Sequence, residues 1–398
     1  MADRNLLEGV RILDLTRVMS GPYCTAMLGD LGAEITKIEM PGFGEEGRHF
    51  APYKEGESTY FMLLNRGKRS IAIDLKSEEG VALVKKLARD SDVVVENFRP
   101  GVAKRLGLDH ETLRAENPKL IYASISGFGQ DGPYAKWPAF DLVIQAMSGL
   151  MSITGEPEGR ANAVGESIAD VATGMFASWG ILAALFDREK TGEGRYLEVA
   201  MLDAVFSMLL TGLSREMFTD KPVRRVGNRH PETYPVDSFA TRDGDVVLVG
   251  FTDRIFAGIC AAIGRPELAQ DPRFIDNQAR NDHENELRGI IADWAKAQTR
   301  AEAVEALQQA GVPAGPVWSL GDVLASDHSA ARGLVASGTN AVLGDIPLIP
   351  QPVHFAGAPR PHGQRAPTLG EDTDAVLAER LGLTADDIAS LREKKVIA

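Results

Sequence analysis

The first 125 residues alternate short β-rich runs with longer helical patterns. The helical patterns include SGPYCTAMLGDLG and KSEEGVALVKKLARD, and the β-rich runs are VRILDL (10–15), EITKIEM (34–40), SIAIDL (70–75), VVVEN (93–97) and LIYASISG (120–127). This alternation is typical of βαβ units, in which parallel strands lie buried between helices. It predicts a doubly wound, Rossmann-like α/β domain.

The pattern changes further along the chain. Helices are expected near 140–150, 171–189 and 202–217, with a strand in TGEGRYLEVAM between the last two. From about 220 to 320 a strand, DGDVVLVGF, is followed by mostly helical segments, and the tail reads as a Pro-rich loop and a terminal helix. A chain of 398 residues is too long for one small core. We expect a large domain over 1–205 and a smaller α+β domain over 225–320.

Composition and charge narrow the function classes. With 44% hydrophobic and 25% charged residues the chain resembles an ordinary globular protein. Its net charge of −13 argues against nucleic-acid binding. Residues 1–105 hold 16 basic and 16 acidic side chains, so the whole net charge lies beyond them. An anionic ligand is therefore repelled least by this first quarter.

The sequence predicts a reducing, cytoplasmic setting without a membrane anchor. Cys24 and Cys260 lie far apart and form no CxxC pair, which disfavours both a disulfide framework and a zinc site. The first residues lack the pattern of a signal peptide. The longest uncharged stretch, 171–186, is shorter than the roughly 20 residues of a spanning helix. We expect it to form a buried core helix.

A glycine pattern after the second predicted strand invites a dinucleotide site. GFGEEG (42–47) formally matches GxGxxG. Glu45 and Glu46 would face a pyrophosphate, however, and no amphipathic helix follows. We interpret the segment as a surface loop.

Basic side chains follow two of the predicted strands or flank them. Those in NRGKRSIAIDLK are Arg66, Lys68, Arg69 and Lys76, and those in ENFRPGVAKRLG are Arg99, Lys104 and Arg105. Solvated surface charge is the ordinary explanation of such runs. A phosphate site is the alternative, because ligands of open α/β sheets bind beyond the carboxyl ends of strands. Asn97, Phe98 and the Pro100-Gly101 turn would then line an adenine or pantetheine channel.

The sequence lacks the motifs of several common hydrolytic enzymes. The seven histidines show neither HxH nor HExxH spacing, and no GxSxG is present. Metal-assisted hydrolysis and serine-hydrolase chemistry are disfavoured. A glycosidase-type carboxylate pair stays open, since the fold assembles such pairs.

Asp170 stands at the start of a long uncharged run in ESIADVATGMFASWGILAALF. Aspartate before an apolar helical run is a preferred N-cap, worth about 1 kcal/mol. The same position suits a nucleophile, since the helix N-terminus favours an ionised carboxylate and offers N–H groups to an oxyanion. Local features do not decide between the two.

Ordered motifs along nearly the whole chain resemble those of the family III CoA-transferases, the formyl-CoA transferase and carnitine CoA-transferase family. They are ILDLTRVMSGPYC, LGAEITKIEMPG, NRGKRSIAIDLK, VVVENFRPG, ISGFGQDGPY, SIADVATG, GILAAL, TGEGRYLEVAMLDA, GN at 227–228, GVPAGPV and APTLGEDT. The resemblance implies that Asp170 is the catalytic nucleophile. Its carboxylate would attack an acyl-CoA, pass through a mixed anhydride and carry CoA as an aspartyl-CoA thioester to the acceptor acid.

The resemblance also implies which residues contact CoA: Arg17, Val18, Met19, Ser20, Ile73, Lys76, Asn97, Phe98 and Arg105. Three positions differ from formyl-CoA transferase, which has His at the position of Arg17, Gln at that of Met19 and a basic residue at that of Met40. The glycine-rich loop that follows GN in that enzyme is missing here. We therefore do not expect oxalate/formate specificity. The acceptor pocket is expected to involve Phe140, Arg229 and His230, and a dicarboxylate such as succinate to be a substrate.

Two alternatives remain. The 2-methylacyl-CoA racemases of the same superfamily pair the equivalent aspartate with a His in a GHD segment, where this chain has AFD with Phe140. A proton transfer at the α-carbon needs a second acid or base, which Phe cannot supply. A CoA-binding protein without catalysis would leave Asp170 idle.

Relatives in this family form interlocked homodimers in which each chain is a ring threaded through its partner. The resemblance implies the same assembly here, with the large domain completed by 334–398. It implies no permanently bound cofactor and no metal, since CoA enters as the thioester substrate.

Overall fold

The computed structural model describes residues 5–361 and 363–398, and the chain divides into two compact units. Unit 1 comprises Met1–Leu150, Ala163–Thr211 and His328–Ala398. Unit 2 comprises Met151–Asn162 and Gly212–Asp327. Each unit is therefore assembled from segments that are distant in sequence.

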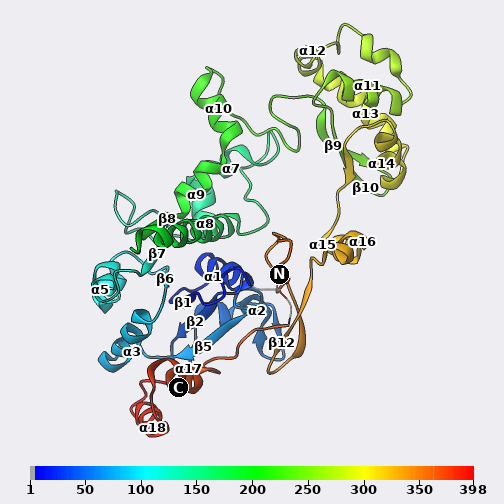
Figure 1. Ribbon diagram of the computed structural model, residues 1–398. Helices are drawn as coiled ribbons and strands as arrows, with labels where there is room; N and C mark the ends of the chain where they lie inside the picture. The colour runs from blue at the N-terminus through cyan, green and yellow to red at the C-terminus, as the bar shows by residue number, and fades with distance from the viewer. Residues whose placement is uncertain (1–4, 362) are drawn as a thin grey trace. The chain divides into compact units, whose positions relative to one another are not determined.

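The centre of unit 1 is a parallel sheet (Figure 1). Among the described residues its six strands are β1 (Arg11–Asp14), β2 (Glu34–Glu39), β5 (Lys68–Ala72), β6 (Val93–Glu96), β7 (Ile121–Ser126) and β8 (Tyr196–Ala200). Their order is β5-β2-β1-β6-β7-β8, with Ile12 of β1 paired to both Ile35 and Val93. The order reverses between β1 and β6, as in Rossmann-type sheets. The predicted doubly wound α/β fold is confirmed.

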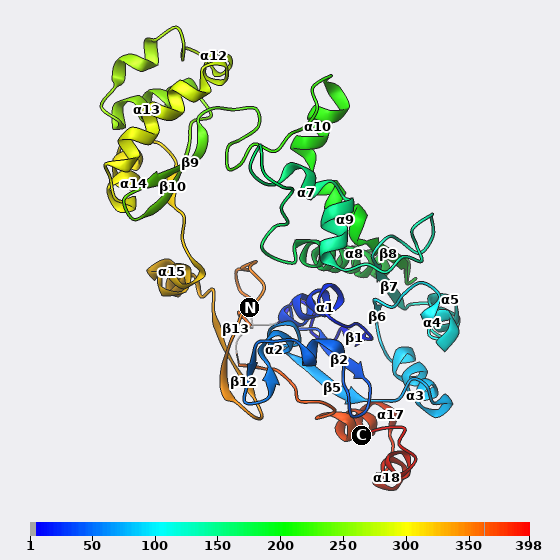
Figure 2. The same cartoon turned by 180° about the vertical axis from the view of Figure 1, so that it is seen from behind.

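Helices cover both faces of this sheet, because its strands carry apolar side chains on both sides. Helices α1 (Ser20–Asp30) and α8 (Ile168–Thr191) pack on one face, against Ile12, Val93 and Ile121. Helices α3 (Glu78–Arg89), α5 (His110–Glu116), α17 (Thr373–Leu381) and α18 (Ala385–Glu393) cover the other. Figure 2 shows the same layers from behind.

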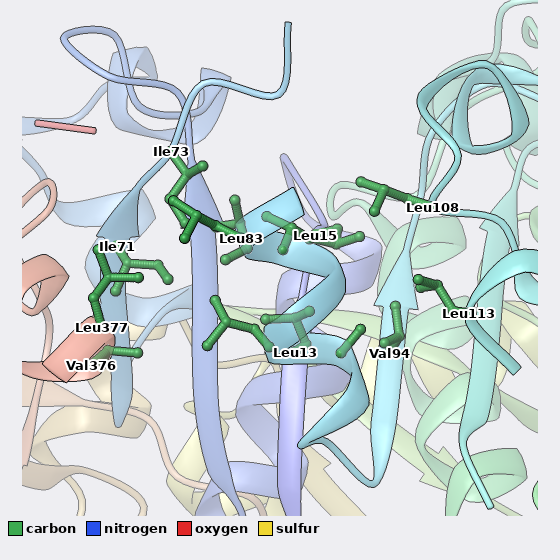
Figure 3. Close-up of a cluster of buried hydrophobic side chains, with 14 of the residues drawn as sticks. Leu13, Leu15, Ile71, Ile73, Leu83, Val94, Leu108, Leu113, Val376 and Leu377 are labelled. Atoms are coloured by element: carbon green, nitrogen blue, oxygen red, sulfur yellow. The ribbon is translucent and has the colours of Figure 1, made fainter. Parts of the chain in front are cut away.

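The second face shows why the two ends of the chain belong to one core. Leu83 of α3 packs with Leu13 of β1, and Leu377 of the C-terminal α17 joins Ile71 of β5 in the same cluster (Figure 3). Hydrogen bonds add to this apolar contact: Asp372 accepts from Ser70 N at 3.0 Å, and Thr373 Oγ1 accepts from Ala72 N at 3.1 Å. The tail thus completes the edge of the sheet beside β5.

Three sequence predictions differ from the structure. Strand β5 starts at Lys68 and ends at Ala72, because Ile73 leaves the sheet and bridges to Ile397. The helix expected over 202–217 is two helices, α9 (Met201–Met208) and α10 (Leu210–Phe218). The Pro-rich tail contains a small sheet of β12 (Ala336–Asn340), β13 (Gly344–Leu348) and β14 (Gln364–Arg365) that the composition did not predict.

Unit 2 is an α+β unit with its own core. A three-stranded sheet consists of β9 (Val236–Thr241), β10 (Gly244–Val249) and β11 (Ala314–Pro316). The helices of this unit include α11 (Asp253–Ala262), α12 (Asn277–Asp282), α13 (Glu284–Lys296) and α14 (Arg300–Gln309). Phe239, Phe256 and Ile291 lie in the apolar cluster between sheet and helices.

Candidate active site

A cavity of about 420 Å³ opens at the carboxyl ends of the strands, where the strand order reverses. It is lined by segments that follow β1, β6 and β7 and by the start of α8. The lining includes Arg17, Val18, Ser20, Glu46, Phe50, Asn97, Phe98, Trp137, Phe140 and Asp170. This is the position in which open α/β sheets bind ligands.

The loops after β1 and β6 are tied together by Asn97. Its Oδ1 accepts from the backbone N of Arg17 at 2.9 Å, and its Nδ2 donates to the Arg17 carbonyl at 2.8 Å. The next residue, Val18, has φ of 66°, a region that a β-branched residue rarely adopts. Its N–H donates to Glu45 Oε2 at 2.9 Å. Asn97 and Glu45 thus hold a strained turn at the cavity wall, at a cost on the order of 1–3 kcal/mol.

Glu45 corrects the interpretation of GFGEEG as a surface loop. The glutamate is buried, accepts from Gly47 N at 2.7 Å and lies 3.8 Å from Lys37 Nζ. The residues after it form the short 3-10 helix η1 (Glu46–His49). The segment turns inward at Glu45, whose carboxylate accepts the hydrogen bond from the backbone N–H of Val18.

Asp170 is not the N-cap of its helix. Ser167 occupies the cap position and makes no side-chain capping bond, and Asp170 is the third residue of α8. The free N–H of Ala169 instead donates to Asp141 Oδ1, at 2.8 Å, from α6 (Asp141–Met147). The capping prediction is therefore wrong, and the Asp170 carboxylate is left to face the cavity.

The carboxyl group of Asp170 binds its proton more tightly than an ordinary aspartate. Burial and then the nearby negative charge of Asp141 raise its pKa to about 6, while the hydroxyl and backbone N–H of Ser20 act in the opposite direction. A helix N-terminus by itself favours the ionised carboxylate. Desolvation outweighs it, but a group with this pKa is still mostly ionised at pH 7.

Two further hollows continue from the cavity. The second, of about 190 Å³, shares Arg17 and Phe98 with the first and adds Ile73 and Lys76. The third, of about 420 Å³, shares Lys76 with the second and adds Lys85 and Arg105. The three hollows, all within unit 1, therefore form a row from a carboxylate to a basic cluster. In the described part of the chain no carboxylate pairs with Lys76, Lys85 or Arg105.

This row contains most of the residues singled out from the sequence. Arg17, Val18, Ser20, Asn97, Phe98, Phe140 and Asp170 line the first hollow, Ile73 and Lys76 the second, and Arg105 the third. Met19 is the N-cap residue of α1 and lies beside the lining, between Val18 and Ser20. The side chain of Phe140 is 65% exposed at the rim.

Arg229 and His230 lie in unit 2 and already have partners there. Arg229 donates to Asn281 Oδ1 at 2.9 Å and pairs with Glu284 at 3.0 Å. His230 Nδ1 accepts from the backbone N of Glu232 at 3.2 Å. The Arg229 charge is thus balanced within unit 2.

Two basic residues of NRGKRSIAIDLK are neither surface charge nor ligand contacts. Lys68 is buried and donates to Asp14 Oδ2 at 2.9 Å and to Asn65 Oδ1 at 2.8 Å. Arg66 is buried against Asp30, with a shortest distance of 2.6 Å. Both form internal ion pairs, and Arg69 pairs with Glu379 at 2.6 Å, so within this stretch the phosphate-site interpretation survives only for Lys76.

Sequence reasoning missed three residues of this region. Tyr60, in α2 (Thr59–Leu64), has a pKa raised by burial and then by the negative charges of Asp170, Glu45 and Glu166. No sequence pattern links Tyr60 to Asp170, since only the fold brings them together. Lys85 lies on the helix that follows Lys76, and Asp141 is the third residue of the AFD segment. Both residues therefore lie in or next to motifs that were singled out from the sequence.

One helix of the described chain, α8, is long and apolar enough to cross a membrane. It packs on α1 and on the sheet of unit 1, which explains half of its apolar surface as protein core. The predicted core helix is confirmed only in part, because Trp179 and Phe186 of this helix are 69% and 66% exposed. Both cysteines are buried and unpaired with each other.

Known proteins resemble the chain over nearly its whole length. The profile of the family described as CoA-transferase family III matches residues 7–373. An acetyl-CoA:oxalate CoA-transferase of Acetobacter aceti is 40% identical over 94% of this chain and 95% of its own. A succinate–glutarate CoA-transferase of Agrobacterium fabrum is 39% identical over 94% and 95%. The crystal structure of a CAIB/BAIF family protein from Brucella suis matches with a TM-score of 0.85 and 36% identity, over 94% of this chain and 99% of that one.

Proposed function

Since the chain belongs to CoA-transferase family III, we propose that it moves CoA from an acyl-CoA donor to a free carboxylic acid. The observation that carries this proposal is the row of three hollows. A carboxylate stands at one end, and at the other stand three basic side chains that form no ion pair with a carboxylate of the described residues. Such a row suits a long ligand with a reactive acyl group at one end and phosphates at the other.

The CoA moiety would lie along Arg17, Val18, Met19, Ser20, Asn97 and Phe98, with Ile73 and Lys76 beyond them and Arg105 at the phosphate end. Lys85 joins this set, because it lines the same hollow as Lys76 and Arg105. The Arg17 guanidinium stacks over Phe98 at 5.6 Å and pairs with Glu46 at 2.9 Å, which stiffens the passage between the first two hollows.

Asp170 would act as the nucleophile. Its carboxylate attacks the thioester carbonyl, the C–S bond breaks, and a mixed anhydride and CoA thiolate result. The thiolate then attacks the aspartyl carbonyl, which gives an aspartyl-CoA thioester and releases the donor acid. The acceptor carboxylate attacks this thioester, and the steps run in reverse. The backbone N–H of Ser20 favours negative charge on Asp170 and would also stabilise the oxyanions.

The acceptor would be a dicarboxylic acid. Relatives are named for oxalate and for succinate and glutarate, and a third, from Chloroflexus aurantiacus, for D-citramalate. Phe140 lines the same cavity as Asp170, and Tyr60 lies near enough for the Asp170 charge to act on it, so both would shape the space for the acceptor chain. Arg17 and Arg99 are basic residues that line this cavity, whereas the predicted contribution of Arg229 would require it to leave Glu284. Arg229 and His230 stay predictions.

Racemisation of 2-methylacyl-CoA is the weaker candidate. Phe140 occupies the position at which the racemases have a histidine, and its ring at the cavity rim carries no proton to exchange. Deuterium uptake at C2 of a 2-methylacyl-CoA in heavy water would favour that activity.

We also propose the interlocked homodimer. Helices α6, α8 and α9 pack on one another, and each exposes large apolar side chains, among them Leu142, Met175, Trp179 and Phe206. Such a patch marks an interface in a soluble protein. The enzyme would work in the cytoplasm with no permanently bound cofactor.

The decisive experiment compares wild type, Asp170→Asn and Asp203→Asn. The enzyme is incubated with succinyl-CoA and a panel of carboxylates, and new CoA esters are followed by mass spectrometry. We expect Asp170→Asn to lower kcat by at least about 10³-fold. Asp203, exposed in α9 and away from the hollows, provides the matched control and should retain activity. Full exchange activity in Asp170→Asn would overturn the assignment.

A further inference from the structure

Two residues of α6 hold the first turn of α8 from outside that helix. Asp141 Oδ1 accepts from Ala169 N at 2.8 Å, and Asp141 Oδ2 accepts from Gln145 Nε2 at 2.6 Å. Gln145 is only 1% exposed. Its Oε1 accepts from Val164 N at 2.9 Å, so it also ties down the loop that leads into α8. The two side chains form one continuous set of hydrogen bonds around the residues that precede Asp170.

These bonds replace a cap that the helix lacks. Ser167 at the N-cap makes no side-chain hydrogen bond to the first turn. Without Asp141, the N–H of Ala169 would lose its only partner among the described hydrogen bonds. Ala169 directly precedes Asp170, so fraying of this turn would move the Asp170 carboxylate.

We propose that Asp141 and Gln145 are positioning residues for Asp170, which they hold by fixing the first turn of α8. The proposal rests on the proposed role of Asp170. In that chemistry the same carboxyl carbon and oxygens take part in every acyl exchange, as attacking group and as the group attacked. The orientation of this carboxyl group is therefore needed at each step of a turnover. A misplacement of about 1 Å can cost roughly a hundredfold in rate.

The charge of Asp141 has a second effect. It raises the pKa of Asp170, after burial and in the same direction. The other groups that face this carboxyl are Ser20 of α1, which lowers the pKa, and the neutral Tyr60 of α2; Glu166 of the preceding loop also acts on Tyr60. Loss of the Asp141 charge should therefore shift the acid limb of kcat/KM to lower pH, which a merely structural residue would not do.

The test uses three variants of the full chain: Asp141→Asn, Gln145→Glu and the double variant. An asparagine at 141 keeps the acceptor for Ala169 but turns an amide toward the Gln145 amide, so one bond is lost. In the double variant the new amide can donate to the new carboxylate, which still accepts from Val164, and only the long 3.3 Å bond from Gln145 Nε2 to the Glu166 carbonyl is not restored. We expect each single variant to lower kcat roughly 10- to 100-fold with KM for acyl-CoA changed less than about threefold. The double variant should recover at least about tenfold.

Hydrogen exchange of the Ala169 amide gives a readout that does not need activity. It should be at least about tenfold faster in Asp141→Asn and Gln145→Glu than in wild type and slower again in the double variant. Asp203→Asn is the matched control. Unchanged kcat and exchange in both single variants, or no recovery in the double variant, would overturn the positioning role. If Asp170→Asn instead kept full activity, the proposed function would fail, while the exchange data would still test the contacts.

Discussion

Two basic residues from one stretch of sequence end in opposite surroundings. Lys68 lies in the interior of unit 1, where Asp14 Oδ2 and Asn65 Oδ1 accept hydrogen bonds from its Nζ at 2.9 and 2.8 Å. Lys76 stands exposed between two hollows, and its ammonium group forms no ion pair in the described chain, although Asp74 and Glu78 line the same hollows. A buried charge must be paired, whereas an exposed one is free for an anionic ligand. Whether a lysine stabilises the fold or is available to bind a ligand thus depends on its ion-pair partner more than on its residue type.

The largest expected effect comes from making the same change at both positions. Lys68→Met leaves Asp14 buried without its cation and should cost about 3–5 kcal/mol of unfolding free energy. Lys76→Met should change stability by less than about 0.5 kcal/mol. Urea unfolding of the two variants checks this. Equal stability losses would remove the distinction between the interior and the exposed lysine.

The carboxylate end of the row is expected to respond to pH. In the proposed mechanism ionised Asp170 is the nucleophile, and its pKa of about 6 places the loss of that form below neutrality. kcat/KM should therefore fall about tenfold for each pH unit below 6 and lie on a plateau above about 7. Rates at pH 4.5–8 with a saturating acceptor measure this limb. A limb that ends below pH 5 would mean that Asp170 is less desolvated than its surroundings indicate.

The basic end should respond to the ligand's phosphates. Arg105→Gln and Lys85→Gln should each raise KM for acyl-CoA about tenfold with little change in kcat, because each removes one charge-assisted contact. An acyl-pantetheine, which lacks the phosphates of the nucleotide, serves as the control substrate. Wild type and variants should use it equally well. A defect that persists with acyl-pantetheine would place the two residues nearer to the chemistry.

Much of this fold could be predicted from sequence, because its strands are short apolar runs separated by helical patterns. The strands around Ile12, Val94 and Tyr122 follow local periodicity, and the family motifs selected most residues of the row of hollows. The sheet in the Pro-rich tail carried no such period. Nor could local pattern separate Lys68 from Lys76, since Asp14 reaches Lys68 only in the folded chain. The capping role of Asp141 was hidden for the same reason, because the helix it caps lies elsewhere in the sequence.

The smallest expected effect concerns the contribution of Asp170 to the free energy of unfolding. The pKa of Asp170 is higher in the folded protein than the usual value of 3.8, so the folded state binds this proton more tightly than the unfolded state. Ionisation of Asp170 at pH 7 therefore opposes folding, and the stabilising protonated form is reached only as the pH falls through about 6.

Asp170→Asn removes the charge while keeping the shape. Although inactive, this variant should be more stable than wild type at pH 7, by on the order of 1 kcal/mol, and the gain should vanish near pH 4. Thermal unfolding at the two pH values measures it, with Asp203→Asn as the exposed control. A variant less stable than wild type at pH 7 would mean that the hydrogen bonds from Ser20 outweigh desolvation, in contrast to the order of effects that sets the pKa.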